Sequence, residues 1–270
     1  MEEEMTKKAN IFANLYQLSF EVKEKVIKEL IDNDIDVSET FHPDADFNIV
    51  IGGDGTFIKA VHDSEFSSIP FIGINTGHLG FYNDVKYYEV EEAIKKLKEN
   101  DFILNHLKVI DCEIITDDKT YTYNSINEIV LKAKYTSIMN FDLYVDHVKL
   151  QTFAGDGILF STPSGSTAYN LSAGGALLCQ NLNAFQITPL AAIRSSLHRS
   201  LDKSLVVPKE TLIRLVPKSR GDVPFSIGVD GIHKEHDNIR EINIKLSDKI
   251  INKIVFNPDW FWINIKEKFI

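Results

Sequence analysis

The stretch from Phe47 to Val61 constrains the fold of this chain more than any other part of the sequence. Residues 47–51 form a short, mostly apolar and β-branched run, which is typical of a strand buried on both faces. Residues 52–55 then read Gly-Gly-Asp-Gly, and from Thr56 on the apolar spacing predicts a helix that packs back on the sheet. A strand, a glycine turn and a helix in this order direct backbone N–H groups and the positive end of a helix dipole at an anion.

Asp54, in the middle of this turn, distinguishes the motif from the common phosphate loops. A P-loop has lysine after its second glycine, where this chain has Thr56, and the dinucleotide fingerprint has a third glycine where this chain has Ile58. A carboxylate repels phosphate unless a cation intervenes or the carboxylate contacts a reacting hydroxyl. Taken alone, the turn is equally compatible with a tight connection that carries a solvated aspartate.

Composition and charge exclude several classes of protein. The chain has 270 residues, enough for one large or two small domains, and no apolar run approaches the roughly 18 residues of a membrane span. Residues 1–4 are acidic and do not resemble a secretory signal, and Cys112 and Cys179 have no close partner, so we expect free thiols in the cytoplasm. A net charge of −10 argues against nucleic-acid or anionic-membrane partners.

The first third of the chain alternates strands and helices, which predicts a parallel, Rossmann-like sheet. Ser19 is expected to cap a helix with an apolar face, and both glycine-rich turns, 52–55 and 77–80, fall at the carboxyl edge of the sheet, where ligands bind. The expected strands are residues 8–13, 47–51 and 70–75, and the expected helices have apolar faces formed by Val22, Val26, Ile27, Leu30 and Ile31 and by Val90, Ala93, Ile94 and Leu97.

Short strand-like runs dominate the rest of the chain, with hairpin turns expected at Asp117-Asp118 and Asp230-Gly231. We therefore predict an α/β N-terminal domain over residues 1–103, an all-β sandwich domain over 104–257, and a tail, 258–270, that returns to the first domain. The predicted strands of the second domain are 109–116, 120–123, 128–132, 140–145, 150–153, 158–161, 205–207, 212–216, 225–229, 239–246 and 251–256.

Residues 155–175 are the most unusual part of the second domain. An apolar strand runs into a block rich in serine, threonine and glycine that also contains Tyr169. Hydroxyl groups can bind a base edge or a ribose, and a tyrosine offers a stacking face. The competing interpretation is a polar loop before a helix that Ser164 or Ser166 caps. The density of hydrogen-bonding side chains favours a binding site.

Four motifs together resemble one family. The turn at residues 52–56, the segment 75–81, the Asn127-Glu128 pair and the block 162–169 occur in the order found in NAD kinases, and the resemblance covers nearly the whole chain. The first motif alone is not specific, because diacylglycerol and sphingosine kinases share it. The resemblance, closest to bacterial NAD kinases, implies transfer of the γ-phosphate of ATP, or of a phosphate of polyphosphate, to the 2′-hydroxyl of the adenosine ribose of NAD.

The resemblance also assigns roles to residues. Asp54 would be the base, Gly53, Gly55 and Thr56 would contact phosphates, and Phe81 would contact adenine. Asn127 and Glu128 would hold the ribose and adenine of the dinucleotide. The remaining members of the implied dinucleotide pocket are Ala154, Asp156, Thr167, Ala168, Tyr169, Ser172 and Ala191, with Asp156 and Ser172 near a nicotinamide or ribose and Tyr169 stacking.

The implied site departs from the family pattern at Ala154, because many relatives have arginine or lysine two residues before the pocket aspartate. Lys59, Arg194 and Arg199 are the candidates to replace that cation. Mg²⁺ carried with ATP would bridge the phosphates, without a dedicated metal cage in the protein. A homotetramer follows by analogy with the family.

Other functions remain as alternatives. A lipid kinase would share the Asp54 turn but would need an apolar cavity or membrane surface, and a non-catalytic NAD-binding module would explain Ala154 as a sign of lost catalysis. His233 and His236 lack the spacing of zinc proteases and favour a solvated hairpin over a metal site. Ser164 and Ser166 lack the Gly-x-Ser-x-Gly context of serine hydrolases.

Overall fold

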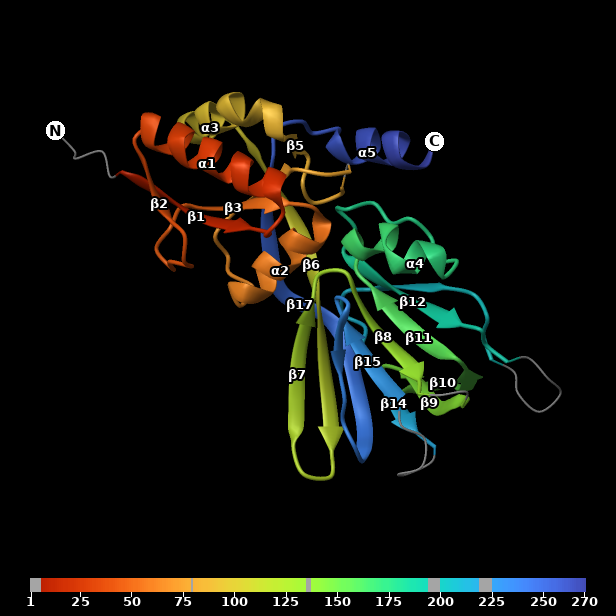
Figure 1. The fold of residues 1–270 in the computed structure, drawn as a ribbon. Coiled ribbons are helices and arrows are strands. Elements are labelled where there is room, and N and C mark those ends of the chain that lie inside the picture. Colours follow the sequence, from red (N-terminus) through yellow and green to blue (C-terminus); the bar gives the residue numbers. More distant parts are fainter. Residues whose placement is uncertain (1–5, 79, 135–136, 194–199, 219–224) are drawn as a thin grey trace. The chain divides into compact units, whose positions relative to one another are not determined.

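The computed structural model of the chain describes residues 6–78, 80–134, 137–193, 200–218 and 225–270 (Figure 1). The chain divides into two compact units. The first unit comprises Met1–His106 and Ile250–Ile270, and the second comprises Leu107–Lys249. The chain re-enters the first unit earlier than the predicted boundary at residue 258.

A parallel sheet forms the centre of the first unit, as predicted. Its strands run in the order β4, β3, β1 and β2, with β5 and the last part of β17 both paired with β4, and every pairing is parallel. The sequence did not indicate β2 and β5, which are only four and two residues long. The bounds are β1 Lys7–Ala13, β2 Ile35–Ser38, β3 Phe47–Gly52, β4 Phe71–Asn75, β5 Val85–Lys86 and β17 Ile239–Val255.

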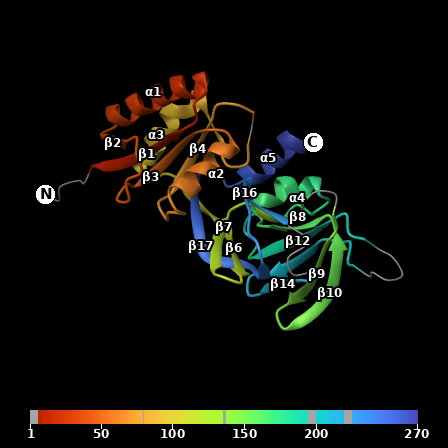
Figure 2. The same cartoon turned by 60° about the horizontal axis from the view of Figure 1, so that its bottom comes forward.

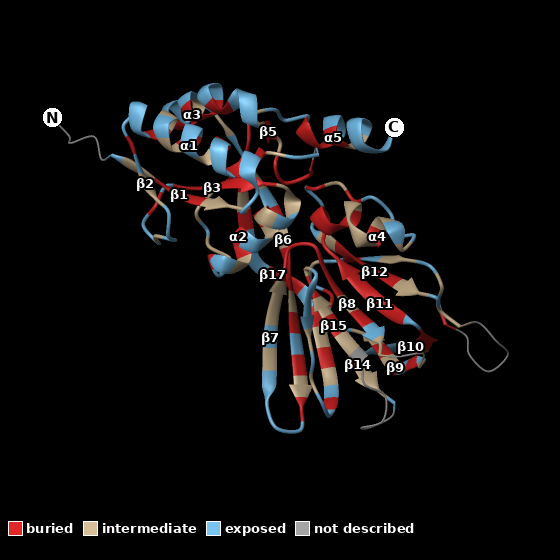
Figure 3. Cartoon of the chain, in the orientation of Figure 1, coloured by how far each residue is buried: buried red, intermediate tan, exposed pale blue. Residues whose placement is uncertain are grey.

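Helices cover both faces of this sheet. Helices α1 (Gln17–Asp32) and α3 (Val90–Glu99) pack on one face, where Val26 and Ile94 share a core with Ile49 (Figure 1). Helix α2 (Asp54–Asp63) covers the other face, where the Phe57 ring stacks on Tyr82 with centroids 4.9 Å apart. Strand β3 is consequently buried along its whole length (Figure 3), as its apolar sequence predicts.

The predicted start and apolar face of α1 are wrong in detail. The helix begins at Gln17, and Ser19 lies inside it, buried, with its hydroxyl oxygen 2.6 Å from Oγ1 of Thr76. Val22 and Leu30 are buried, but Ile31 is 61% exposed. Successive helical residues are separated by about 100°, so Ile31 falls outside the face that Leu30 buries.

The C-terminal helix α5 (Trp260–Phe269) belongs to the first unit, which confirms the predicted return of the tail. Trp260 and Phe261 are both 7% exposed and form a small core with Phe81 and Val255. Burial of two aromatic side chains is a large stabilising contribution and anchors the first turn of the helix.

The second unit is a β-sandwich, as predicted. One antiparallel layer contains β10, β9, β14 and the first part of β17, with β6 and β7 joined to it; the other runs β13, β12, β11, β8, β15 and β16 (Figure 2). Phe141 and Phe153 of the first layer share one core with Phe160 and Phe185 of the second. The bounds are β6 Ile103–Thr116, β7 Thr120–Ser125, β8 Glu128–Ala133, β9 Met139–Val145, β10 Val148–Gly155, β11 Gly157–Ser161, β12 Ala184–Leu190, β13 Leu205–Pro208, β14 Ile213–Pro217, β15 Phe225–Val229 and β16 Ile232–Lys234.

Both predicted hairpins are present, one between β6 and β7 and one between β15 and β16. Asp230 and Gly231 have φ values of 48° and 80°, the left-handed conformation that a two-residue hairpin turn requires. Strands β12 and β16 were not predicted, and β17 is one continuous strand where two were expected.

Candidate functional site

The glycine turn places Asp54 at the start of α2 rather than in a loop. Gly53 is the N-cap and Asp54 the first helical residue, so the predicted start at Thr56 is two residues too late. A Cβ on Gly52 would lie 2.3 Å from Oγ1 of Thr56, so only glycine fits there. A Cβ on Gly53 or Gly55 would meet no described heavy atom within 4 Å, and the turn therefore leaves room for a ligand at the helix N-terminus.

The carboxylate of Asp54 is held by the backbone of a second loop. Oδ2 accepts the N–H of Phe81 at 2.9 Å, and Oδ1 accepts the N–H of Tyr82 at 3.0 Å. Each carboxylate oxygen has two lone pairs, so both can accept a further hydrogen bond. The Asp54 side chain is 29% exposed, and Nζ of Lys268 lies 4.0 Å from Oδ2. The carboxylate is thus fixed in direction and still accessible.

Asn75, the last residue of β4, shapes the loop that holds Asp54. Its Nδ2 donates to the carbonyl oxygens of His78 and Asn83, at 2.9 Å and 3.2 Å, and its Oδ1 accepts the N–H of Gly77 at 2.7 Å. The Phe81 side chain is only 4% exposed, and its ring stacks on Phe269 with centroids 5.8 Å apart. Phe81 therefore contributes its N–H to the site, and its contact with adenine stays a prediction. Leu79 lies outside the described residues.

Two side chains of the C-terminal segment fix the same loop from its other side. The fully buried Lys253 donates from Nζ to the carbonyl oxygen of Phe81 at 3.3 Å and pairs with Oδ1 of Asp84 at 2.9 Å. Burial lowers the pKa of Lys253, and the nearby carboxylates of Asp84 and Asp54 oppose that shift. Asn264 of α5 donates from Nδ2 to the carbonyl oxygen of Gly80 at 3.1 Å.

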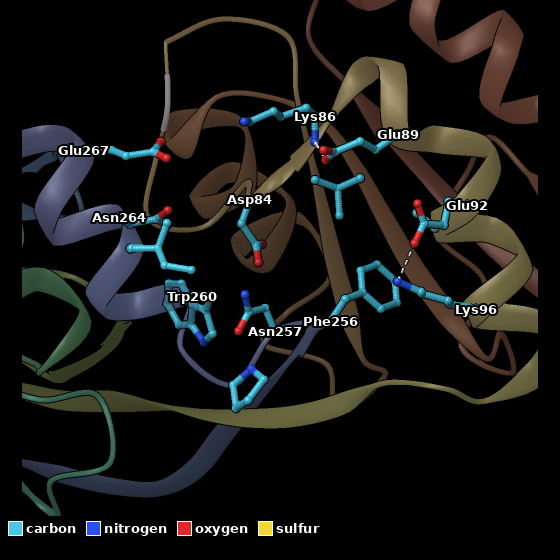
Figure 4. A pocket seen from close by; sticks show the side chains of 14 residues that line it. Asp84, Lys86, Glu89, Glu92, Lys96, Phe256, Asn257, Trp260, Asn264 and Glu267 are labelled. Carbon is cyan, nitrogen blue, oxygen red and sulfur yellow. Dashed lines mark hydrogen bonds and ion pairs between the residues drawn. The ribbon is translucent and has the colours of Figure 1, made fainter.

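A pocket of about 460 Å³ lies beside this anchor (Figure 4). Asp84, Trp260 and Asn264 line it on the side of α5, and Glu92 and Lys96 of α3 form an ion pair at its opposite wall. Its described lining includes none of the residues predicted for the site. The pocket therefore borders the elements that support Asp54 without reaching the carboxylate.

In the second unit, the structure brings Asn127 and Glu128 together with the serine- and threonine-rich block. Glu128 opens β8 and pairs in register with Ser161, and the N–H of Thr162 donates to the carbonyl oxygen of Asn127 at 2.9 Å. A Cβ on Gly165 would lie 2.1 Å from the same carbonyl oxygen, so this contact requires glycine.

Glu128 is a buried carboxyl group that can bind a ligand. Burial, with the nearby negative charge of Asp230 as a second cause, raises the pKa of Glu128 to about 7. Its Oε2 is buried and has no hydrogen-bond partner among the described residues. The carboxylate of Asp230 accepts the backbone N–H groups of Ile126, Asn127 and Glu128 at 3.0, 2.8 and 3.2 Å, and so fixes the backbone of the pair.

Most hydroxyl groups of the block donate hydrogen bonds within the protein itself, and their contact with a nucleotide stays a prediction. Ser164 donates to Oε1 of Gln180 at 3.0 Å, and Ser166 donates to the carbonyl oxygen of Pro163 at 2.7 Å. Thr167 donates to the carbonyl oxygen of Ser164 at 3.1 Å. The cause is the tight 3₁₀ turn η2 (Ser164–Thr167), whose N-cap is Pro163, so neither serine caps a helix.

Two of the remaining predicted residues, Asp156 and Tyr169, line a second pocket of about 570 Å³ together with Lys132. Nζ of Lys132 lies 4.6 Å from the centroid of the Tyr169 ring. Tyr169 opens the short helix α4 (Tyr169–Ser172), with Ala168 before it, and Ser172 is exposed at its end. The structure thus brings Asp156 and Tyr169 together around one cavity.

Backbone hydrogen bonds hold the segment that contains Ala154 and Asp156 beside the segment that contains Ala191. The N–H of Asp156 donates to Leu190 at 3.0 Å, and the N–H of Ile193 donates to Ala154 at 2.8 Å. Ala191 has φ 46°, a left-handed conformation that is strained for a residue other than glycine. Strain of this kind occurs often at ligand sites, which is consistent with the predicted role of Ala191.

Of the three residues that could replace the cation missing at Ala154, the structure describes only Lys59. Ala154 itself is buried, and Lys59 is 72% exposed on α2, where it pairs with Asp63. Arg194 and Arg199 lie outside the described residues. Sequence reasoning missed Lys132 and Lys268, since a lysine in a strand or a terminal helix is ordinarily a solvated charge.

The two histidines of the weaker motif contact neighbouring side chains. His233 pairs with Glu235 at 2.9 Å, whereas His236 packs on Tyr121 with ring centroids 4.0 Å apart. Among the described residues, no group of three or more histidine, cysteine, aspartate or glutamate side chains is arranged to hold a metal ion. Burial raises the pKa of the Cys112 thiol to about 12, which makes it unreactive. Within the described part of the chain, no helix is both long enough and apolar enough to cross a membrane.

Comparisons with known proteins give matches along most of the chain. The model of the ATP-NAD kinase N-terminal domain matches residues 1–102, and that of the ATP-NAD kinase C-terminal domain matches residues 126–251. An NAD kinase of Finegoldia magna is 43% identical over 265 residues, 97% of each chain, and one of Streptococcus pyogenes serotype M1 is 35% identical over 230 residues, 83% of this chain and 81% of that protein.

Two solved structures share the fold. Yeast NADH kinase complexed with NADH has a TM-score of 0.86 at 20% identity and covers 97% of this chain and 87% of its own. An NAD kinase from Archaeoglobus fulgidus in complex with ATP has a TM-score of 0.76 at 22% identity and covers 96% of this chain and 98% of its own.

Proposed function

Because the chain belongs to the NAD kinase family, we propose that it transfers the γ-phosphate of ATP to the 2′-hydroxyl of the adenosine ribose of NAD and releases NADP and ADP. The observation that supports this most directly is the carboxylate of Asp54, which two backbone N–H groups hold in place at the N-terminus of α2.

Asp54 acts in this proposal as a general base. It accepts the hydrogen bond of the 2′-hydroxyl and directs the oxygen at the γ-phosphorus. The new O–P bond forms as the bond from the γ-phosphorus to the bridging oxygen of ADP breaks, and the hydroxyl proton passes late to the carboxylate. General-base assistance contributes roughly 10²- to 10⁴-fold, and the remainder comes from positioning and from stabilising charge on a loose phosphoryl group.

The turn and the dinucleotide pocket supply that positioning. Gly53, Gly55 and Thr56 offer backbone and hydroxyl groups to phosphates at the helix N-terminus. In the second unit, an ionised Glu128 accepts hydrogen bonds from ribose hydroxyls, and the pocket around Tyr169 offers a stacking face. Asn127, Asp156, Thr167, Ala168, Ser172 and Ala191 complete the proposed dinucleotide site.

Further parts of the proposal follow from the family. Mg²⁺ carried with ATP would neutralise part of the charge of the phosphates, and the Asp54 carboxylate is the acidic group at the helix N-terminus that could bind it. A homotetramer and a cytoplasmic location follow by analogy. Polyphosphate is a second possible donor, because a helix N-terminus binds any phosphate chain.

Asp54→Asn tests the proposed base. We expect kcat to fall at least about 10²-fold, with a smaller change in the KM for NAD, because the amide of asparagine takes no proton from the 2′-hydroxyl. The assay incubates purified protein with NAD, ATP and Mg²⁺ and measures NADP with a dehydrogenase specific for it. Asp63→Asn, at the exposed end of the same helix, is the matched control.

Three outcomes would contradict parts of the proposal. Full activity of Asp54→Asn, with an unchanged melting temperature, would refute the role of the base. Phosphorylation of diacylglycerol but not NAD, assayed in parallel with labelled ATP, would favour a lipid kinase. Tight NAD binding without NADP formation by the parent protein would favour a non-catalytic binding module.

A further inference from the structure

We propose that Lys268, in the last turn of α5, binds the transferring phosphoryl group and supplies positive charge beside Asp54. This inference rests on the proposed function, since it assigns a residue to the same phosphoryl transfer. Neither the sequence motifs nor the comparisons point to Lys268.

The ammonium of Lys268 lies beside the Asp54 carboxylate and keeps N–H donors available to a ligand. Nζ of Lys268 lies 4.0 Å from Oδ2 of Asp54, at the outer limit of an ion pair, and the side chain is 37% exposed. Both oxygens of Asp54 already accept backbone N–H groups, so the carboxylate does not depend on the lysine for a partner. An ammonium has three N–H donors, which remain available to a ligand at this distance.

The position suits a phosphoryl oxygen better than any other part of the substrate. The hydroxyl that Asp54 orients becomes bonded to phosphorus, so the transferring group lies next to this carboxylate in the transition state. Its oxygens carry the charge that develops there, and a cation held in place beforehand stabilises that charge without reorganisation. A lysine 4.0 Å from Asp54 reaches these oxygens by a small rotation of its flexible side chain.

The last turn of α5 is fixed by contacts that set the position of Lys268. Asn264, one turn earlier and on the same helix face, donates to the carbonyl oxygen of Gly80 in the loop that holds Asp54. Trp260 and Phe261 are buried at the start of the helix. The Lys268 ammonium also lies 4.8 Å from the centroid of the Phe81 ring, a cation–π contact that restrains it.

The other described lysines of the first unit near this place are engaged elsewhere. Lys253 is fully buried and paired with Asp84, so it supports the loop and is closed to substrate. Lys59 is exposed on α2 and paired with Asp63. Lys268 therefore combines nearness to Asp54 with access to a ligand.

The test compares three variants with the parent protein. Lys268→Gln removes the charge and keeps most of the side chain, Lys268→Arg keeps the charge, and Lys266→Gln makes the same change at an exposed position of the same helix. We expect Lys268→Gln to lower kcat about 10- to 100-fold, less than the loss of a dedicated arginine finger. The KM for NAD and the melting temperature should stay at the parent values. Lys268→Arg should recover most of the rate, and Lys266→Gln should match the parent.

Each other outcome has a defined meaning. A kcat of Lys268→Gln within twofold of the parent would overturn the inference, as would a Lys268→Arg variant as slow as Lys268→Gln. A lowered melting temperature together with a raised KM for NAD would show a merely structural role and would also overturn it. If the parent itself makes no NADP, the proposed function fails; if the parent is active and Lys268→Gln is equally active, only the role of Lys268 fails.

Discussion

Replacing Gly80 with alanine tests whether the position of the Asp54 carboxylate controls the reaction. Gly80 is buried in the loop that donates two backbone N–H groups to Asp54. An added Cβ would lie 2.0 Å from Oδ1 and 2.6 Å from Cγ of Asp54. The carboxylate or the loop must move, because heavy atoms do not approach that closely.

The structure gives the size of this displacement. The distance of 2.0 Å between the added Cβ and Oδ1 of Asp54 must increase by at least about 1 Å to relieve the steric overlap. A misplacement of 1 Å at a reacting group costs about 10²-fold in rate, so we expect kcat to fall about 100-fold. Overpacking costs about 1–3 kcal/mol in unfolding free energy, so the folded state should be weakened but populated.

Gly77→Ala provides a matched control in the same loop, because a Cβ there would meet no described heavy atom within 4 Å. Both variants would be assayed for NADP formation well below their melting temperatures, with kcat and the KM for NAD determined separately. The expected result is a large loss of kcat for Gly80→Ala and parent kinetics for Gly77→Ala. A Gly80→Ala enzyme with kcat within threefold of the parent would refute the argument that this loop positions the base.

Two predictions concern the dinucleotide site. Because the pKa of Glu128 is raised to about 7, its carboxylate is ionised above that pH and protonated below it. The KM for NAD should therefore rise as pH falls from 8 to 6, while Glu128→Gln should have a high KM at every pH in this range. A parent KM that is flat from pH 8 to 6 would contradict the assignment. Lys132→Gln removes the cation over the Tyr169 ring and should raise the KM for NAD about fivefold, with kcat unchanged. A fivefold change corresponds to about 1 kcal/mol of binding free energy. A fall in kcat alone would argue against a binding role.

The elements that the sequence predicted correctly are those whose burial is visible in the residue pattern. β3 is apolar because both of its faces are covered, and α3 shows its buried stripe of Val90, Ala93, Ile94 and Leu97 directly. β12 was missed because Gln186, Thr188 and Pro189 interrupt its apolar run, although the first two are buried and hydrogen-bonded to Asn170. A polar network inside a core has no period that a sequence pattern can reveal.

The sequence motifs predicted the candidate binding residues, but not the residues that hold their backbone in position. Asp54 and Glu128 stand in recognisable contexts, whereas Asp230 was seen only as a turn residue. Its carboxylate accepts three consecutive backbone N–H groups and thereby shapes the Asn127-Glu128 pair. The sequence separates Asp230 from that pair by about a hundred residues, and only the pairing of β15 with β8 brings them together.

The hydroxyl-rich block illustrates that residue chemistry alone does not show which hydroxyl groups donate within the protein itself. Ser164, Ser166 and Thr167 have the groups that a nucleotide needs, but each binds a neighbouring carbonyl or amide oxygen of the protein. A tight turn has unsatisfied backbone groups of its own, and nearby hydroxyls satisfy them first. Composition therefore indicates polarity, while the topology decides which polar groups remain for a ligand.

The overall charge of the chain makes the positions of a few lysines decisive. With a net charge of −10, the protein repels a polyphosphate at long range, so attraction has to come from contacts at short range. In the first unit, the N-terminus of α2 and the ammonium of Lys268 both lie at Asp54. In the second unit, Lys132 lies over Tyr169 in the pocket with Asp156. Each lysine lies next to a carboxylate or an aromatic ring that limits its freedom, so a phosphate that reaches it meets a cation already in place.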